Sequence, residues 1–210
     1  MLTCPDAPKT LRFPLEVDAR IRHLNAPHAL PLTRFVKDLR RTQGTAYSVP
    51  FFDPCDGCAD ARVLFLGEAP GPKAVKSGFI SRNNPDETAK NSFELHQDAG
   101  LARCEVALWN IVPWYVGAEG KIRPVSESDL REAGVWLKQL LGLLPKLRGV
   151  VLVGDKAQRG FRLDILQSHL QIFESPHPSP SNLNTRPESR GRILESWGNV
   201  ANWLREMGPG

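Results

Sequence analysis

Three short segments rich in glycine, proline and polar residues carry side chains that could act on a substrate. They are Gly67–Pro72 (GEAPGP), Asn110–Tyr115 (NIVPWY) and Ser175–Asn182 (SPHPSPSN). A carboxylate such as Glu68 can orient water or stabilise positive charge, and an amide such as that of Asn110 both donates and accepts hydrogen bonds. A histidine such as His177 can donate to an oxygen that gains negative charge. Taken singly, the three segments could instead be a rigid turn, a helix cap and a polyproline linker.

Each segment follows a short apolar run of the kind that forms a buried parallel strand. Four such runs are present: Arg62–Gly67 (RVLFLG), Val106–Asn110 (VALWN), Val150–Gly154 (VVLVG) and Leu170–Glu174 (LQIFE). Ligand sites of open parallel sheets form at the carboxyl ends of the strands. The sequence therefore predicts that Glu68, Asn110 and His177 converge at one edge of a sheet.

Helical patterns alternate with these strands. They cover residues 29–43, 86–99, 126–144, 155–167 and 187–206. The second begins at Pro-Asp-Glu, and the third opens with SESD, close to a capping box. Strands alternating with helices imply a parallel sheet covered on both faces. We expect an α/β fold, a three-layer αβα sandwich around a four-stranded parallel sheet. Residues 1–210 form one domain, with 1–60 as an N-terminal helical extension packed on it.

Composition is that of an ordinary globular chain that is free to bind nucleic acid. The 210 residues are 41% hydrophobic and 24% charged, with a net charge of +4. An excess of lysine and arginine permits phosphate binding without demonstrating it. No apolar run approaches the roughly 20 residues that span a bilayer, and the N-terminus does not have the pattern of a signal peptide. We expect a cytoplasmic protein, associated with the bacterial nucleoid.

The four cysteines do not form a recognisable framework. Cys4, Cys55, Cys58 and Cys104 are too few and too irregularly spaced for a set of disulfides, so reduced thiols are the simpler interpretation. Cys55 and Cys58 have the spacing of metal ligands, but no second pair completes a quartet. Zinc on this pair remains an alternative to the expectation that no metal is bound.

In this order and on these strand ends, the three segments resemble the signature motifs of the uracil-DNA glycosylase superfamily. GEAPG is similar to the first motif of its thermostable bacterial branch, and HPSPSN is similar to its later histidine motif. The resemblance spans residues 61–186. It implies a monofunctional DNA glycosylase that flips uracil out of DNA and hydrolyses its N-glycosidic bond without a cofactor. It also implies DNA as the partner, no membrane and a monomeric protein.

The resemblance also assigns roles to individual residues. It makes Glu68, Asn110 and His177 catalytic, and it assigns contacts with the base to Gly67, Ala69, Phe79, Asn110 and His177, with Phe79 stacking on the flipped base. Contacts with DNA fall to Pro70, Gly71, Ser179, Ser181, Asn182, Leu183 and Arg186. Leu183 is the nearest aliphatic candidate for a wedge that fills the vacated space. Arg190 and Arg192 could grip flanking phosphates or lie on a solvated helix start.

Three departures from the branch pattern stand out. Ala69 occupies a position where other branches carry a water-activating aspartate, and Pro72-Lys73-Ala74 replaces an acidic run. No cysteine follows Asn110 in the region where the branch has an iron–sulfur ligand. We therefore expect a divergent member without the cluster.

Other interpretations remain open. A glycosylase for hypoxanthine or xanthine would share the scaffold, and a protein that binds uracil or abasic sites without turnover would agree with Ala69. A nucleotide-binding protein would need a glycine-rich fingerprint that GEAPGP does not match. The basic face of helix 29–43, with Arg34, Lys37, Arg40 and Arg41, could contact phosphates or simply face solvent.

Overall fold

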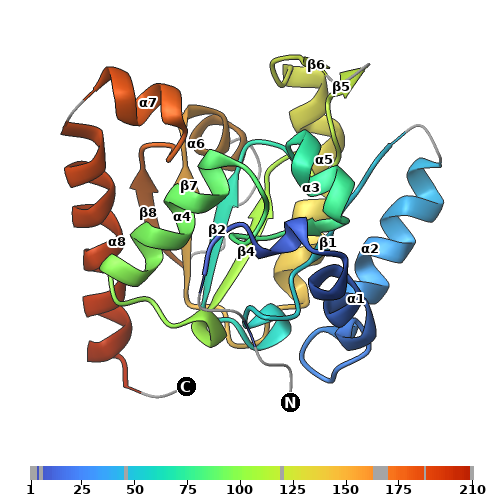
Figure 1. Ribbon diagram of the computed structural model, residues 1–210, viewed down its shortest axis with the longest axis horizontal. Coiled ribbons are helices and arrows are strands. Elements are labelled where there is room, and N and C mark those ends of the chain that lie inside the picture. The colour runs from blue at the N-terminus through green and yellow to red at the C-terminus, as the bar shows by residue number, and fades with distance from the viewer. Residues whose placement is uncertain are drawn as a thin grey trace.

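A four-stranded parallel sheet forms the centre of the computed structural model, which describes residue 4 and residues 7–44, 47–118, 121–162, 170–186 and 188–208 (Figure 1). Its strands are β2 (Val63–Gly67), β4 (Val106–Asn110), β7 (Gly149–Val153) and β8 (Gln171–Ser175). They lie side by side in the order β4-β2-β7-β8, and all neighbouring pairs are parallel. The four predicted strands are thus confirmed to within one residue at either end.

The helices lie where the sequence pattern predicts them. They are α2 (Leu30–Gln43), α4 (Glu87–Asp98), α5 (Glu127–Gly142), α6 (Asp155–Arg162) and α8 (Glu188–Glu206). Two of them begin at the predicted caps: the Asp86 carboxylate accepts from the Ala89 amide, and Ser126 forms a capping box with Asp129. The predicted residues 163–167 and 187 lie outside the described part of the chain.

Alternating side chains of the sheet build two apolar cores. Leu64 and Leu66 of β2 point into a core shared with α2, α5 and α6, whereas Val63 and Phe65 point into a core shared with α4 and α8. Helices therefore cover both faces of the sheet (Figure 1). This confirms the three-layer αβα sandwich.

Several short elements carry no periodic signal in the sequence and were therefore not predicted. They are α1 (Pro14–His23), α3 (Pro72–Ser77), α7 (Pro180–Thr185), the paired strands β1 (Phe51–Phe52) and β3 (Phe79–Ile80), and the hairpin strands β5 (Gly117–Ala118) and β6 (Lys121–Ile122). Both α3 and α7 begin with proline, whose fixed φ suits the first helical turn. The motifs GEAPGP and HPSPSN therefore each end inside a short helix.

The N-terminal residues share the core of the sheet. Leu32, Phe35, Val36 and Leu39 of α2 are buried in the same cluster as Leu64 of β2. We propose that residues 1–60 form one domain with the remainder of the chain. None of the helices in the described ranges combines the length and the apolar character that crossing a bilayer requires.

Candidate active site at the carboxyl edge of the sheet

Pairing between β2 and β4 continues beyond the strands and sets the first half of the site. The amide of Ile111 donates to the Gly67 carbonyl at 2.8 Å, and the amide of Val112 donates to the Glu68 carbonyl at 3.0 Å. These bonds align the loop that carries Glu68 with the loop that carries Asn110. A side chain at position 67 would place its Cβ 3.0 Å from Oδ1 of Asn110, which explains the glycine there.

The ends of β7 and β8 set the second half. Gly154 has a φ of +84°, and its amide donates to the Ser175 carbonyl at 2.9 Å. A Cβ at Gly154 would lie 3.2 Å from Cβ of His177, so the glycine both makes the turn and leaves room for the histidine. The His177 loop is held by Asn182, whose Nδ2 donates to the His177 carbonyl, and by Asn91 of α4, whose Nδ2 donates to the Pro178 carbonyl, both at 2.9 Å.

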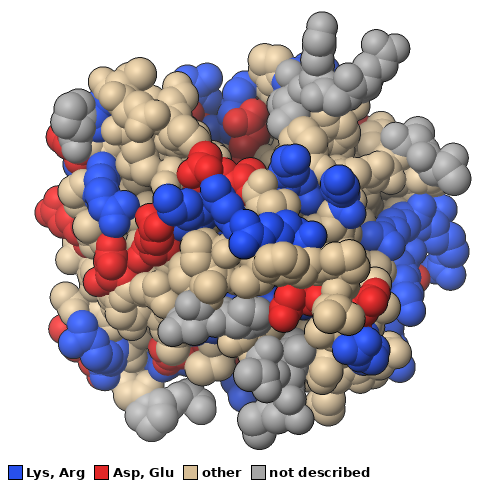
Figure 2. All heavy atoms as spheres, in the orientation of Figure 1, with Lys and Arg blue, Asp and Glu red and all other residues tan. Residues whose placement is uncertain are grey.

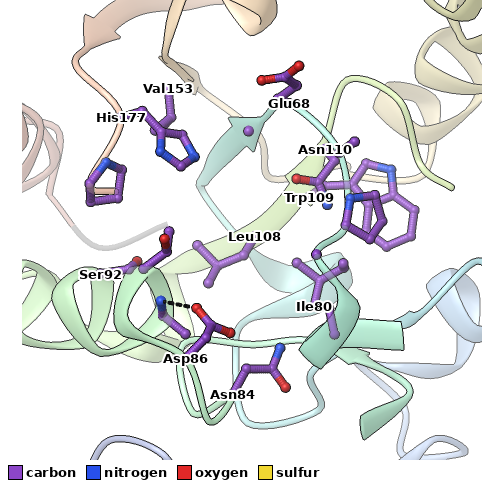
Figure 3. Close-up of a pocket in the computed structure, with 18 of the residues that line it drawn as sticks. Glu68, Ile80, Asn84, Asp86, Ser92, Leu108, Trp109, Asn110, Val153 and His177 are labelled. Carbon is purple, nitrogen blue, oxygen red and sulfur yellow. Dashed lines mark hydrogen bonds between the residues drawn. The ribbon is translucent and has the colours of Figure 1, made fainter. Parts of the chain in front are cut away.

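Glu68, Asn110 and His177 line one cavity of about 810 Å³ (Figure 3). The loops that carry these residues lie at the upper edge of the sheet in Figure 1, opposite the two chain termini. Its walls are mostly apolar, with Leu108 and Ile80 among the lining residues. A mostly apolar cavity with a few convergent polar groups is the usual form of a site for a small molecule.

A second, more polar groove of about 590 Å³ adjoins this cavity. Glu68, Val153, Lys156 and His177 line both hollows. The groove is otherwise lined mainly by the end of β8, the start of α6 and the segment around α7. Glu68 and His177 therefore lie at a junction between an apolar cavity and a polar surface groove. We call the first hollow the base cavity, after the ligand that the sequence resemblance implies, and the second the strand groove, after the DNA strand that the same resemblance implies.

The electrostatics of His177 favour a neutral ring. Burial lowers the pKa of His177, and the nearby Glu68 carboxylate only partly opposes this. In the described part of the chain, no hydrogen bond occupies the side chain of His177 or of Asn110. A neutral imidazole at neutral pH keeps one N–H, which is free to donate to a ligand.

Glu68 is partly engaged by the protein itself. Its Oε1 accepts from the amide of Val125 at 3.3 Å. The carbonyl of Val125 in turn accepts from Nζ of Lys156 at 2.8 Å. The neighbouring Arg123 makes two hydrogen bonds to Asp129, of 2.6 and 2.8 Å. One role of Glu68 is thus to brace the segment that leads into α5.

The structure brings together most of the predicted contacts with the base. Gly67 and Ala69 line the base cavity, as do Pro70 and Gly71, which the sequence analysis had assigned to DNA. The structure corrects the prediction that Phe79 stacks on the flipped base. The ring of Phe79 is 1% exposed, does not line the cavity and packs 6.4 Å from the ring of Phe51. Its neighbour on β3, Ile80, lines the cavity instead.

The other five predicted DNA contacts divide into two groups. Ser179, Ser181, Asn182 and Arg186 line the strand groove. Leu183 is a correction, because it is partly buried and packs against the core between the sheet and α8 instead of standing free as a wedge.

Two arginines that were candidates for phosphate contacts have partners within the protein. Arg190 pairs with Asp98 at 2.7 Å. Arg40 donates to the carbonyl of Val49 and lies 4.0 Å over the ring of Phe51. Arg192 lines the strand groove.

Several residues that line the base cavity were not predicted from the sequence, and Ile80, Arg82, His96, Arg123 and Lys156 are among them. Lys156 directly follows the turn at the end of β7. Because ligand sites form at the carboxyl ends of parallel strands, the same rule that predicted Glu68, Asn110 and His177 could have predicted it. His96 lies on the buried side of a correctly predicted helix, where a histidine gives no separate signal.

The segment with Cys55 and Cys58 lies at the amino end of β4, where the Gly57 amide donates to the carbonyls of Arg103 and Val106. Cys55 and Cys58 are buried, and Sγ of Cys58 donates to the carbonyl of Asp53 at 3.4 Å. Cys4 lies beside them, with its Sγ 3.7 Å from the Cys55 carbonyl, whereas Cys104 is exposed. Across the described ranges, no three His, Cys, Asp or Glu side chains come together as a metal site would require.

Comparison with known proteins identifies a family. No curated protein matches this sequence. Among solved structures, the solution NMR structure of a protein from Methanosarcina acetivorans, provisionally named a uracil DNA glycosylase, matches at 16% identity and a TM-score of 0.43. The match covers 68% of this chain and 92% of that one. The family model of the uracil DNA glycosylase superfamily matches residues 54–198, a span that holds Glu68, Asn110 and His177. The chain belongs to the uracil DNA glycosylase superfamily.

Proposed function

We propose that this protein is a monofunctional glycosylase that removes uracil from DNA and leaves an abasic site. The observation that carries the proposal is the junction at which Glu68 and His177 line both the base cavity and the strand groove, with Asn110 in the base cavity. Membership of the superfamily supports a glycosylase acting on DNA. The N-glycosidic bond joins a base to a sugar. At the junction, the cavity that would hold the base meets the groove that would hold the sugar.

The two hollows match the parts of a flipped nucleotide. A base inside a duplex is shielded, so the enzyme must extrude the nucleotide before it can reach the bond. The base would enter the base cavity, while the sugar and phosphates would lie along the strand groove beside Ser179, Ser181 and Arg186. Lysine and arginine side chains gather across the middle of the face shown in Figure 2 and over α2, which suits a polyanion.

Asn110 is suited to read the base. Its amide can accept from N3–H of uracil and donate to O4. Cytosine presents the reverse pattern and would leave buried polar groups unpaired, at roughly 1–3 kcal/mol each. Its position beside Gly67 fixes the amide at the wall of the base cavity.

His177 and Glu68 would divide the chemistry. As the C1′–N1 bond breaks, its electron pair leaves with the base, and the N–H of neutral His177 donates to O2, where negative charge gathers. The sugar becomes cationic, water adds to C1′, and the proton that water releases balances the charge of the departing uracil anion. The Glu68 carboxylate would stabilise the cation or orient that water, because Ala69 offers no carboxylate of its own.

The first test is excision itself. Labelled oligonucleotides that carry uracil, hypoxanthine, xanthine or thymine, as single strands and duplexes, are incubated with the protein and then treated with alkali. We expect cleavage at uracil, undiminished by EDTA because protein side chains fill every role. If no uracil substrate yields an alkali-labile product, the proposal is wrong. Cleavage at hypoxanthine or xanthine alone would identify a purine glycosylase, for which a cavity of about 810 Å³ has room.

A second test concerns selectivity. We expect Asn110→Asp to slow uracil excision by about 10- to 100-fold, because a carboxylate accepts from N3–H but loses the donor to O4. Excision of cytosine should rise relative to that of uracil. The matched control is Asn202→Asp, the same change on an exposed part of α8, which should leave both rates unchanged. Unchanged uracil kinetics for Asn110→Asp would show that another group reads the base.

A further inference from the structure

Cys4 and Cys55 lie side by side, although 51 positions separate them in the sequence. Sγ of Cys4 lies 3.7 Å from the carbonyl oxygen of Cys55, and the two thiols are close enough to share a hydrogen bond. Both cysteines are reduced; Cys4 is partly exposed, whereas Cys55 is buried. Neither of them lines the base cavity or the strand groove, so the proposed excision of a base gives them no role.

The N-terminal segment is held near Cys55 by hydrogen bonds to Asn83. Nδ2 of Asn83 donates to the carbonyl of Ala7 at 2.8 Å, and the carbonyl of Asn83 accepts from the amide of Leu11 at 3.0 Å. Oδ1 of Asn83 accepts from Nη1 of Arg103 at 2.7 Å. The two thiols therefore meet in a segment that both backbone and side-chain hydrogen bonds position.

The surroundings of Cys4 favour its thiolate, which is the form that reacts with oxidants. The hydrogen bond from Cys55 lowers the pKa of Cys4 most. Burial and the charge of Asp53 oppose this effect, whereas the guanidinium groups of Arg103 and Arg20 lower the pKa further. A partly exposed thiolate close to cationic groups is the usual environment of a reactive cysteine.

Cys55 is suited to react second. Its pKa is raised, chiefly by the hydrogen bond with Cys4 and then by burial, so Cys55 remains a thiol while Cys4 reacts. The larger of these two effects weakens once Cys4 has lost its negative charge. Cys58 is a poorer partner, because its side chain is fully buried and its Sγ donates to the carbonyl of Asp53 at 3.4 Å.

We propose that Cys4 and Cys55 are a modification site, at which a peroxide forms a disulfide that links the N-terminal segment to the core. With hydrogen peroxide, the Cys4 thiolate attacks one oxygen. The S–O bond forms, the O–O bond breaks, and the departing hydroxide takes up the proton that Cys4 had released. Sγ of Cys55 then attacks Sγ of the Cys4 sulfenic acid. The S–S bond forms, the S–O bond breaks, and the hydroxyl leaves as water with the Cys55 proton. The two thiols lose two electrons, which the peroxide gains.

The disulfide would close a loop that contains α1 and α2. Such a link restricts the unfolded chain more than the folded one, in which the two sulfurs already lie together. For a chain of this size we expect the midpoint of thermal unfolding to rise by about 5–10 °C on oxidation, and to return to its first value with dithiothreitol.

The experiment treats the full chain with hydrogen peroxide, blocks the remaining thiols with iodoacetamide and maps the peptides without reduction. The wild type should yield one peptide pair joined through Cys4 and Cys55, lighter by two hydrogen atoms than the separate peptides. Cys104→Ser is the matched control, because it removes the exposed cysteine and should form the same link. Cys4→Ser should form no link at position 55, and peroxide should leave its unfolding midpoint unchanged.

A further variant tests the order of the two steps. Cys55→Ser should leave Cys4 as a sulfenic acid, which dimedone traps as an adduct on Cys4. A dimedone adduct on Cys55 in Cys4→Ser, with none on Cys4 in Cys55→Ser, would reverse the assigned roles and contradict the proposed chemistry. If Cys55→Ser does not fold, the peptide maps of the wild type and Cys4→Ser still decide.

Two results would overturn the proposal. One is a peroxide-treated wild type without the Cys4–Cys55 peptide, including the case in which Cys55 is joined to Cys58 instead. The other is an equal rise of the unfolding midpoint in the wild type and in Cys4→Ser. None of these measurements involves excision of a base, so their outcome is independent of the proposed function.

Discussion

Replacing His177 with alanine should lower the single-turnover rate of uracil excision by about 10²–10³-fold, with little change in DNA affinity. The reason is that, in the proposed mechanism, His177 donates to charge that appears on the base only as the glycosidic bond breaks. Burial keeps its ring neutral, so the N–H is in place before the reaction begins. Single-turnover rates on a uracil duplex and equilibrium binding to the same duplex measure the two quantities. An equal loss of DNA affinity would instead show that His177 already contacts the substrate in the bound ground state.

The comparison with Glu68→Gln tests how the chemistry is divided. We expect a smaller loss, about tenfold, because departure of the base depends more on stabilising the leaving group than on activating water. One oxygen of Glu68 is already engaged by the Val125 amide, and glutamine can preserve that bond through its own carbonyl oxygen. A Glu68→Gln loss equal to or larger than that of His177→Ala would make the carboxylate the principal catalytic group.

The second large effect is expected on stability. Asp53→Asn should reduce the free energy of unfolding by about 3–5 kcal/mol, the usual cost of removing one partner from a buried ion pair. The Asp53 carboxylate is fully buried and lies 3.4 Å from Arg20 and 3.2 Å from Arg103, and it also accepts from Ser81. Burial by itself would raise the pKa of Asp53, but Arg103 and Arg20 outweigh it and hold the pKa below its usual value. Losing the charge leaves Arg20 buried beside a neutral amide.

Urea unfolding of the wild type and two variants checks this prediction. The control is Asp38→Asn, which breaks an exposed pair with Arg41 and should leave the midpoint unchanged. A loss below about 1 kcal/mol for Asp53→Asn would show that the buried cluster is compensated elsewhere. Because Ser81 adjoins Ile80 and Arg82, which line the base cavity, the less stable protein should also bind the base more weakly.

The sequence by itself determined the sheet, its helices and the convergence of the three motifs. Apolar runs and capping signals are local, and a parallel sheet brings the carboxyl ends of its strands to one edge whatever the loops do. Glu68, Asn110 and His177 were placed together correctly for that reason alone. The helix starts at Asp86 and Ser126 were equally local, since each cap is made within three residues.

The tertiary structure decided which neighbouring side chain faces the base cavity. Adjacent side chains of a strand point to opposite sides. The sequence therefore does not tell which of Phe79 and Ile80 faces the base cavity. Pairing of β3 with β1, whose register joins Phe51 to Phe79, turns Phe79 away from the base cavity and Ile80 toward it. That pairing joins segments 28 positions apart in sequence. Local patterns carry no information about such contacts.

Long-range packing likewise determined the partners and the burial of the charged side chains. Asp53 meets Arg20 and Arg103 from distant parts of the chain. Burial, with a smaller contribution from the charge of Arg82, lowers the pKa of His96 only once α4 packs on the core beside the sheet. Leu183 packs on the core because α7 rests on α8. In each case the residue type was visible in the sequence, but the desolvation and the partner that give it a role exist only once separate elements enclose it.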